Sequence, residues 1–126
     1  MTLNVLLIDD SAVMRAMILK TLQMSGLMVG DVHQAADGVQ GLALLQQHWV
    51  DLVMLDIGMP GMRGDEMLEA MRADATFAEI PVLVVTSERD TERVARMLQL
   101  GAVHLPKPFT PEQLRDVVLE LTGAPS

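Results

Sequence analysis

Apolar runs of strand length alternate along the whole chain with segments in which apolar residues recur at helical spacing. The runs are Leu3–Ile8, a weaker one near Val29–Gln34, Leu52–Leu55, Ile80–Val85 and a short Val103–Leu105. Leu52–Leu55 and Ile80–Val85 are apolar throughout, and Leu3–Ile8 is apolar except for Asn4. Such runs are typical of strands that are covered on both faces of a parallel sheet. The alternation predicts an α/β fold, a (βα)5 doubly wound parallel five-stranded sheet, in a single domain.

The first two helical segments follow residues that favour the start of a helix. Ser11 can cap the first segment and Asp37 can cap the second. Before Gly26 ends it, the first segment repeats apolar residues at helical spacing, namely Met14, Met17, Ile18 and Leu22. The second segment carries along one side Val39, Leu42, Ala43 and Gln46.

Three further helices are predicted in the second half of the chain. Residues 65–72 supply the apolar positions Met67, Leu68 and Met71. A helix over about 90–100, which ends at Gly101, is expected to turn inward Val94, Met97 and Leu98. The last helix begins with a capping box, Thr110-Pro111-Glu112-Gln113, and repeats apolar residues at Leu114, Val117, Val118 and Leu121. Residues 1–122 are thus expected to form the domain and 123–126 a short tail.

The composition limits the classes of protein to consider. Aromatic residues make up 2% of the chain, so aliphatic residues and 11 methionines must fill the core, and Trp49 is expected to pack at the end of the second helix. There is no cysteine, and no run approaches the ~20 apolar residues of a membrane span. A net charge of −8 argues against non-specific binding to nucleic acid. We therefore expect a soluble cytoplasmic protein without membrane insertion and without direct contact to nucleic acid.

Polar residues follow four of the five predicted strands. Asp9 and Asp10 come after the first strand, Asp56 after the third, Thr86 after the fourth and Lys107 just past the fifth. In an open α/β sheet, binding sites lie beyond the carboxyl ends of the strands. These side chains are therefore expected to meet at one edge of the sheet.

The chemistry of these residues indicates a phosphoryl site with a metal ion. Three carboxylates form an oxygen-rich cluster that suits Mg²⁺ better than zinc. Neither His33 nor His48 is accompanied by other candidate metal ligands, and both are expected to be incidental. A lysine and a hydroxyl opposite the metal can hold a phosphoryl group. Asp56 is the best candidate nucleophile, because a carboxylate can form an acyl phosphate.

These residues stand in motifs that resemble the receiver domain of two-component response regulators. The motifs are LLIDDS after the first strand, DIGMPGMRG around the third, VVTS after the fourth and KPF after the fifth. They cover essentially the whole chain in the family's order and spacing, and DDSAVMR most resembles chemotaxis-type single-domain regulators. The resemblance implies a flavodoxin-like sheet with strand order 2-1-3-4-5 and a signalling protein rather than an enzyme.

The resemblance also implies roles for the acidic residues. Asp56 would accept a phosphoryl group from the phosphohistidine of a sensor histidine kinase. Asp10, Asp56 and the backbone carbonyl of Gly58 would bind Mg²⁺ directly, and Asp9 would bind it through water. Gly58 and Glu88 occupy positions that tune hydrolysis of the phosphoryl group in this family.

Further roles are implied for the residues after the last two strands. Lys107 would pair with the phosphoryl oxygens and the Thr86 hydroxyl would hydrogen-bond to one of them. The peptide bond between Lys107 and Pro108 would be cis. His104 stands where the family usually has a switch tyrosine or phenylalanine, although the segment to Lys107 is one residue shorter than usual. A histidine there can titrate near neutral pH.

Phosphorylation would change the surface formed by the fourth helix, fifth strand and fifth helix, which would control a protein partner such as a phosphatase or a flagellar or signalling protein. One alternative is a Mg²⁺-dependent phosphohydrolase with an aspartate nucleophile. Gly58 counts against it, because such enzymes usually have a second aspartate at that position. Another alternative is a receiver cut from a longer regulator or hybrid kinase.

Overall fold

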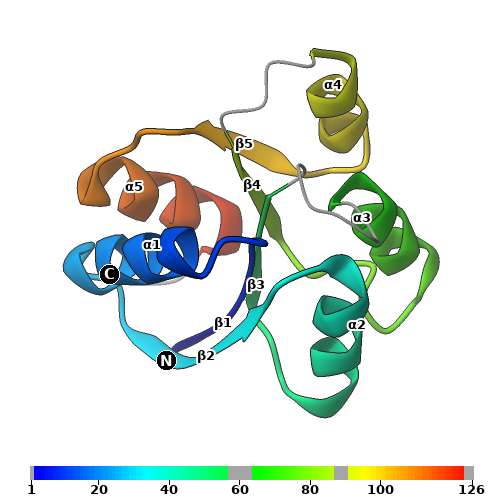
Figure 1. The fold of residues 1–126 in the computed structure, drawn as a ribbon, viewed down its shortest axis with the longest axis horizontal. Helices are drawn as coiled ribbons and strands as arrows, with labels where there is room; N and C mark the ends of the chain where they lie inside the picture. Colours follow the sequence, from blue (N-terminus) through cyan, green and yellow to red (C-terminus); the bar gives the residue numbers. More distant parts are fainter. Residues whose placement is uncertain (1, 57–63, 87–90, 124–126) are drawn as a thin grey trace.

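The computed structural model describes residues 2–56, 64–86 and 91–123, and it forms five strands and five helices in strict alternation (Figure 1). The strands are β1 Leu3–Ile8, β2 Val29–Ala35, β3 Leu52–Leu55, β4 Val82–Thr86 and β5 Val103–Pro106. The helices are α1 Ala12–Met24, α2 Gly38–Gln47, α3 Gly64–Ala73, α4 Thr91–Gln99 and α5 Pro111–Thr122. The strands pair in parallel in the order β2-β1-β3-β4-β5. The predicted fold and strand order are confirmed.

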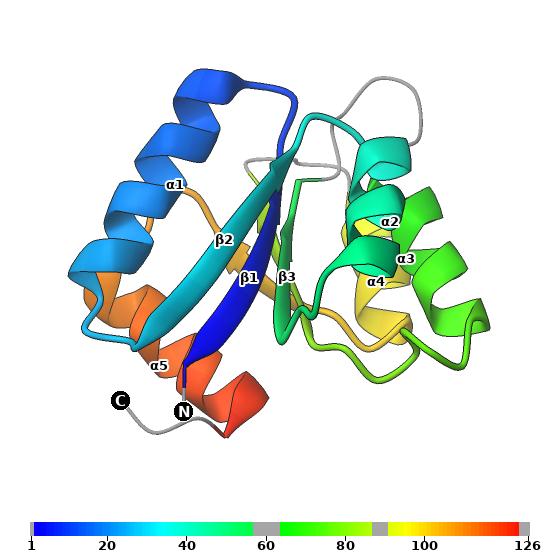
Figure 2. The same ribbon diagram turned by 90° about the horizontal axis from the view of Figure 1, so that it is seen from below.

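The helices form two layers that cover the sheet from both sides. Figure 2 shows α1 and α5 on one side and α2, α3 and α4 on the other. Each layer of helices covers its own apolar cluster on one face of the sheet. The side chains of β1 alternate between the two clusters: Val5 and Leu7 face α1 and α5, while Leu6 and Ile8 face α2, α3 and α4. This double cover explains why β1, β3 and β4 are almost entirely apolar.

Ser11, Asp37 and Thr110 cap α1, α2 and α5, as predicted from the sequence. Each side-chain oxygen accepts a hydrogen bond from the backbone amide three residues later. In α5 the side chain of Gln113 also bonds back to the amide of Thr110, which completes the capping box. Each cap satisfies backbone donors that the first turn of a helix leaves unpaired.

The predicted strand from Ile80 is shortened, because β4 begins at Val82. The Ile80 amide donates to the carbonyl of Phe77 at 3.2 Å, and its carbonyl accepts from Arg72 at 2.9 Å. The amide of Ile80 is therefore used by a turn and its carbonyl by the Arg72 side chain, and neither pairs in the sheet. Pro81, which follows, has no amide hydrogen to donate.

The predicted helix faces are partly wrong. Leu98 in α4 was expected to face inward, but it is 49% exposed. Met17, one of the apolar residues at helical spacing in α1, is 59% exposed. In α2 only Leu42 of the predicted stripe packs against the core, while Val39, Ala43 and Gln46 are exposed. The helix lies against the sheet with Gly41 and Leu45. A Cβ on Gly41 would lie 2.7 Å from Cδ1 of Ile8, so the close approach depends on the glycine.

Trp49 does not pack at the end of α2 as expected, since it is 77% exposed. Its Nε1–H donates to Oδ1 of Asp51 at 2.8 Å. This hydrogen bond satisfies the indole outside the core. None of the helices in the described part of the chain has the length and apolarity needed to cross a bilayer.

Candidate functional site

The backbone brings Asp9 and Asp56 to the same edge of the sheet. The amide of Asp9 donates to the carbonyl of Ala35 at 3.1 Å, and the amide of Asp56 donates to the carbonyl of Ile8 at 3.0 Å. These bonds continue the pairing of β1 with β2 and β3 by one residue beyond the strands. The two acids therefore lie side by side at the carboxyl ends of β1 and β3.

Asp9, Asp10 and Asp56 form one cluster of carboxylates. One oxygen from each lies within 4.8 Å of the oxygens of the other two. Asp9 is buried, Asp56 is half-buried and Asp10 is exposed. Three like charges at this separation repel one another, so the cluster favours a bound cation. Carboxylate oxygens are the ligands that Mg²⁺ prefers, and the donor set therefore fits this ion.

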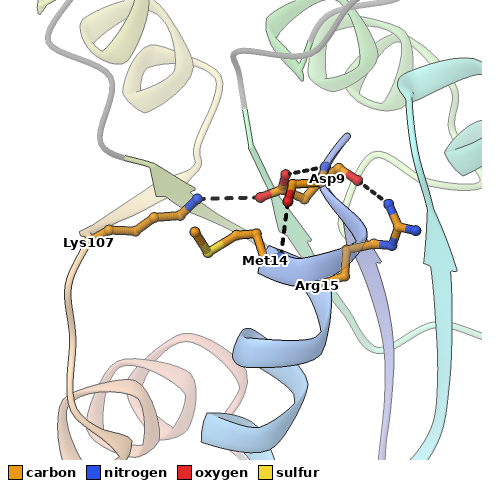
Figure 3. A network of polar contacts seen from close by, with 5 residues as sticks. Asp9, Met14, Arg15 and Lys107 are labelled. Atoms are coloured by element: carbon orange, nitrogen blue, oxygen red, sulfur yellow. Dashed lines mark hydrogen bonds and ion pairs between the residues drawn. The ribbon is translucent and has the colours of Figure 1, made fainter.

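Each carboxylate oxygen of Asp9 has its own polar contact within the site (Figure 3). Its Oδ1 accepts from the amide of Ser11 at 2.9 Å, and its Oδ2 lies 3.3 Å from Nζ of Lys107. Both charged side chains are largely removed from solvent, with 3% of Asp9 and 16% of Lys107 exposed. A buried carboxylate needs such a partner, because desolvation alone would disfavour its charge.

Arg15 is a site residue that the sequence reasoning missed. Its Nη1 donates to the backbone carbonyl of Asp9, and its Nε donates to Oε1 of Gln34 at 3.1 Å. The guanidinium thus fixes the turn that carries the two adjacent acids and ties it to β2. Its sequence signal is one helical turn of separation from the capping Ser11, which is too general to single it out.

The residues after β4 and β5 are placed only in part. The backbone of Thr86 ends β4 opposite Pro106 of β5, while the Thr86 hydroxyl, Gly58 and Glu88 lie outside the part of the chain that is described. The Lys107–Pro108 peptide bond is cis, the configuration that the family resemblance implies. The backbone of these strands therefore brings Lys107 to the acidic edge.

His104 lies on β5 opposite Val84 and is half-buried. Its Nε2 is buried and has no hydrogen-bond partner among the described residues. Val103 and Leu105 pack in the cluster on the α1 and α5 side, so His104 points to the side of α4. This is the side on which the expected switch would act.

Two ion pairs connect α4 with α3 on the same side of the sheet. Arg93 Nη2 lies 3.7 Å from Oδ1 of Asp65, and Arg96 pairs with Glu69. The first pair is mostly buried, with 17% of the Arg93 and 12% of the Asp65 side chain exposed. The basic residues of α4 are thus bound to the neighbouring helix.

Comparison with known proteins agrees with this geometry. A family model described as the response regulator receiver domain matches residues 5–119. Chemotaxis protein CheY-3 of Vibrio cholerae is 32% identical over 115 residues, which are 90% of this chain and 87% of the relative. Chemotaxis protein CheY of Pseudomonas aeruginosa is 32% identical over 117 residues, 92% of this chain and 93% of that protein.

Solved structures share the whole fold. The crystal structure of Vibrio cholerae chemotaxis protein CheY4 superposes with a TM-score of 0.82 and 34% identity, covering 96% of this chain and 99% of that one. A putative response regulator from Chloroflexus aurantiacus has the same fold with a TM-score of 0.87, at 24% identity over 98% of this chain and 100% of that chain. The chain belongs to the response regulator receiver domain family of two-component systems and has CheY-like relatives.

Proposed function

We propose that the protein is a phosphoacceptor switch in which Asp56 accepts a phosphoryl group from the phosphohistidine of a sensor histidine kinase. The observation that carries this proposal is the convergence of the Asp56, Asp10 and Asp9 carboxylates within 4.8 Å, together with Lys107 at 3.3 Å from Asp9. An acceptor carboxylate, a cation-binding cluster and an amine at one edge are the parts that phosphoryl transfer needs. CheY-like relatives of the chain support the same role.

The transfer forms an acyl phosphate on Asp56. A carboxylate oxygen of Asp56 attacks the phosphorus, the phosphorus–nitrogen bond of the phosphohistidine breaks, and the imidazole leaves with the bonding electrons. Lys107 then exchanges its contact with Asp9 for the phosphoryl oxygens, and the Thr86 hydroxyl donates to one of them. The buried position of Lys107 strengthens its attraction to the new charge, because little water screens it.

Asp10, Asp56 and the carbonyl of Gly58 would hold Mg²⁺ directly. Both carboxylate oxygens of Asp9 are already engaged, by the Ser11 amide and by Lys107, which favours its contribution through a water molecule. Bound Mg²⁺ would neutralise charge on the phosphoryl oxygens during transfer. Asp9 keeps Lys107 at the site before the phosphoryl group arrives.

Phosphorylation then controls a downstream protein through the surface of α4, β5 and α5. The new charge of roughly −2 draws Thr86 and Lys107 toward Asp56 and shifts the population of His104 between inward and outward positions. His104 lies beneath α4, so its movement changes the helix surface next to it. Gly58 and Glu88 would tune the lifetime of the acyl phosphate.

We expect a single phosphate adduct when the protein is incubated with acetyl phosphate and Mg²⁺, and a loss of most of the adduct when EDTA removes the metal. Without a cation, three carboxylates repel the incoming dianion. Intact mass at short times measures both outcomes. Catalytic turnover of varied phosphomonoesters would instead favour a phosphohydrolase, and no adduct with any donor would contradict the proposal.

We expect His104→Tyr to leave Mg²⁺ affinity unchanged and to alter the response of the α4, β5 and α5 surface to phosphorylation. A tyrosine ring buries more apolar area than an imidazole, so it changes the balance between the inward and outward positions of residue 104. Amide hydrogen exchange of α4, β5 and α5, measured with and without acetyl phosphate, tests this. The same phosphorylation response in both proteins would exclude a switch role for His104.

A further inference from the structure

The end of α2 and the connection from α3 to β4 enclose an apolar hollow beside Trp49. The cavity, which we call the Trp49 hollow, has a volume of about 170 Å³. Its lining consists of the apolar residues Leu45, Trp49, Val50, Phe77 and Ile80 together with His48 and Thr76. Small-molecule sites typically measure ~300 Å³ or more. The Trp49 hollow therefore fits one anchoring side chain of a larger partner.

Trp49 is exposed but held in place. Its indole donates to Oδ1 of Asp51 at 2.8 Å, and Oδ2 of Asp51 accepts from the amide of Asn4 at 2.9 Å. The preceding residue, His48, stacks on His33 of β2 with ring centroids 3.9 Å apart. A fixed aromatic side chain loses little entropy on binding, and tryptophan is enriched at the centre of protein interfaces.

The charges near the Trp49 hollow are acidic. Asp51 follows two residues after Trp49, and Asp74 and Glu79 are exposed on the connection between α3 and β4. The sequence has no lysine or arginine in residues 21–62 or 73–88. Arg72, which precedes the second of these stretches, is already engaged, because its guanidinium donates to three backbone carbonyls. Asp51, Asp74 and Glu79 thus form an acidic rim around the Trp49 hollow. This rim complements a positively charged partner.

We propose that the Trp49 hollow docks a segment of another protein that carries one large apolar side chain flanked by lysine or arginine. The apolar side chain fills the hollow against Trp49 and Phe77, and the basic residues face the acidic rim. Val50 lines the hollow before β3 begins, whereas Asp56 follows the end of β3. Docking therefore leaves the phosphoacceptor accessible and is independent of phosphorylation.

The fluorescence of Trp49, the only tryptophan, reports this docking directly. The probe is a synthetic helical peptide with leucine on one face and lysine on the other, and its control has glutamate in place of lysine. We expect the lysine peptide to shift the emission of Trp49 to shorter wavelength in a saturable, salt-sensitive manner. The glutamate peptide should bind at least tenfold more weakly.

Matched variants separate the Trp49 hollow from general attraction to an acidic protein. The double variant Asp74→Asn with Glu79→Gln should lower the affinity for the lysine peptide about tenfold. The double variant Glu112→Gln with Glu120→Gln on α5 removes the same charge and should leave that affinity unchanged. In calorimetry, Trp49→Ala should abolish binding of the lysine peptide. Val13→Ala, which changes an exposed apolar side chain on α1, should leave binding unchanged. Asp56→Asn should bind like the unaltered protein, so this test is separate from the phosphoacceptor role.

Three results would overturn the proposal. The first is equal affinity for the lysine and glutamate peptides, and the second is unchanged affinity after Trp49→Ala. The third is self-association of the protein that Trp49→Ala abolishes, because it would assign the Trp49 hollow to a second copy of the chain. Sedimentation of the free protein measures this last outcome.

Discussion

Asp56→Asn is expected to carry no phosphate after incubation with acetyl phosphate and Mg²⁺ under conditions that label the unaltered protein. An amide of the same shape is a poor nucleophile, so the acyl phosphate cannot form. The variant should also bind Mg²⁺ more weakly, because one of three converging carboxylates is neutral. Without metal it should be more stable by about 1 kcal/mol, since repulsion within the cluster falls. Intact mass and urea denaturation measure these effects.

Asp116→Asn is the matched control for this change. Asp116 lies on α5 with 71% of its side chain exposed, and the substitution removes the same charge far from the cluster. It should leave labelling and Mg²⁺ affinity unchanged and alter stability by less than about 0.5 kcal/mol. If Asp56→Asn retained a full adduct, the phosphoryl group would have to be assigned to another residue.

Arg72→Met is expected to destabilise the protein by about 3 kcal/mol. The guanidinium donates to the carbonyls of Leu100 at 2.7 Å, Ala78 at 3.0 Å and Ile80 at 2.9 Å. Hydrogen bonds to a charged group contribute roughly 1.5–3 kcal/mol each, and their effects are not additive. Burial lowers the pKa of Arg72, yet an arginine stays charged at neutral pH and the three bonds persist. Chemical denaturation measures the loss.

Two further variants test this explanation. Arg72→Lys keeps the charge but cannot reach three carbonyls in a planar arrangement, so it should recover only part of the stability. Arg115→Met removes an arginine from α5 whose ion pair is largely exposed, and it should cost less than about 0.5 kcal/mol. If Arg72→Met lowered the free energy of unfolding by less than about 1 kcal/mol, the α3–β4 and α4–β5 connections would keep their conformation without the guanidinium.

The strands were predictable because their hydrophobic signal is simple, whereas their order was implied by the family resemblance. Buried parallel strands leave unbroken apolar runs such as Leu52–Leu55, and the turns after them carry the polar residues of the site. Parallel pairing then brings Asp9 and Asp56 together whatever the loops do in detail. The meeting of Lys107 with Asp9 follows from the same topology.

Helix faces were less predictable because periodicity counts apolar residues and overlooks glycine. Gly41 contributes nothing to an apolar stripe, yet it allows α2 to approach Ile8 and Met67 closely. Val39 completes an apparent stripe and is nevertheless 60% exposed. The stacking of His33 on His48 depends on where α2 ends relative to β2, and no local pattern encodes that distance.

The methionine-rich composition gives the protein two classes of thioether with different chemical fates. Met54, Met67, Met71 and Met97 are at most 1% exposed, whereas Met17, Met24 and Met28 are more than half exposed. Peroxide converts accessible methionine to a polar sulfoxide, which a packed core cannot accommodate. The surface thioethers therefore react in the folded state, while the buried ones react only when the protein opens. The oxidation rates of the buried thioethers thus report how often each layer of the core is exposed to solvent.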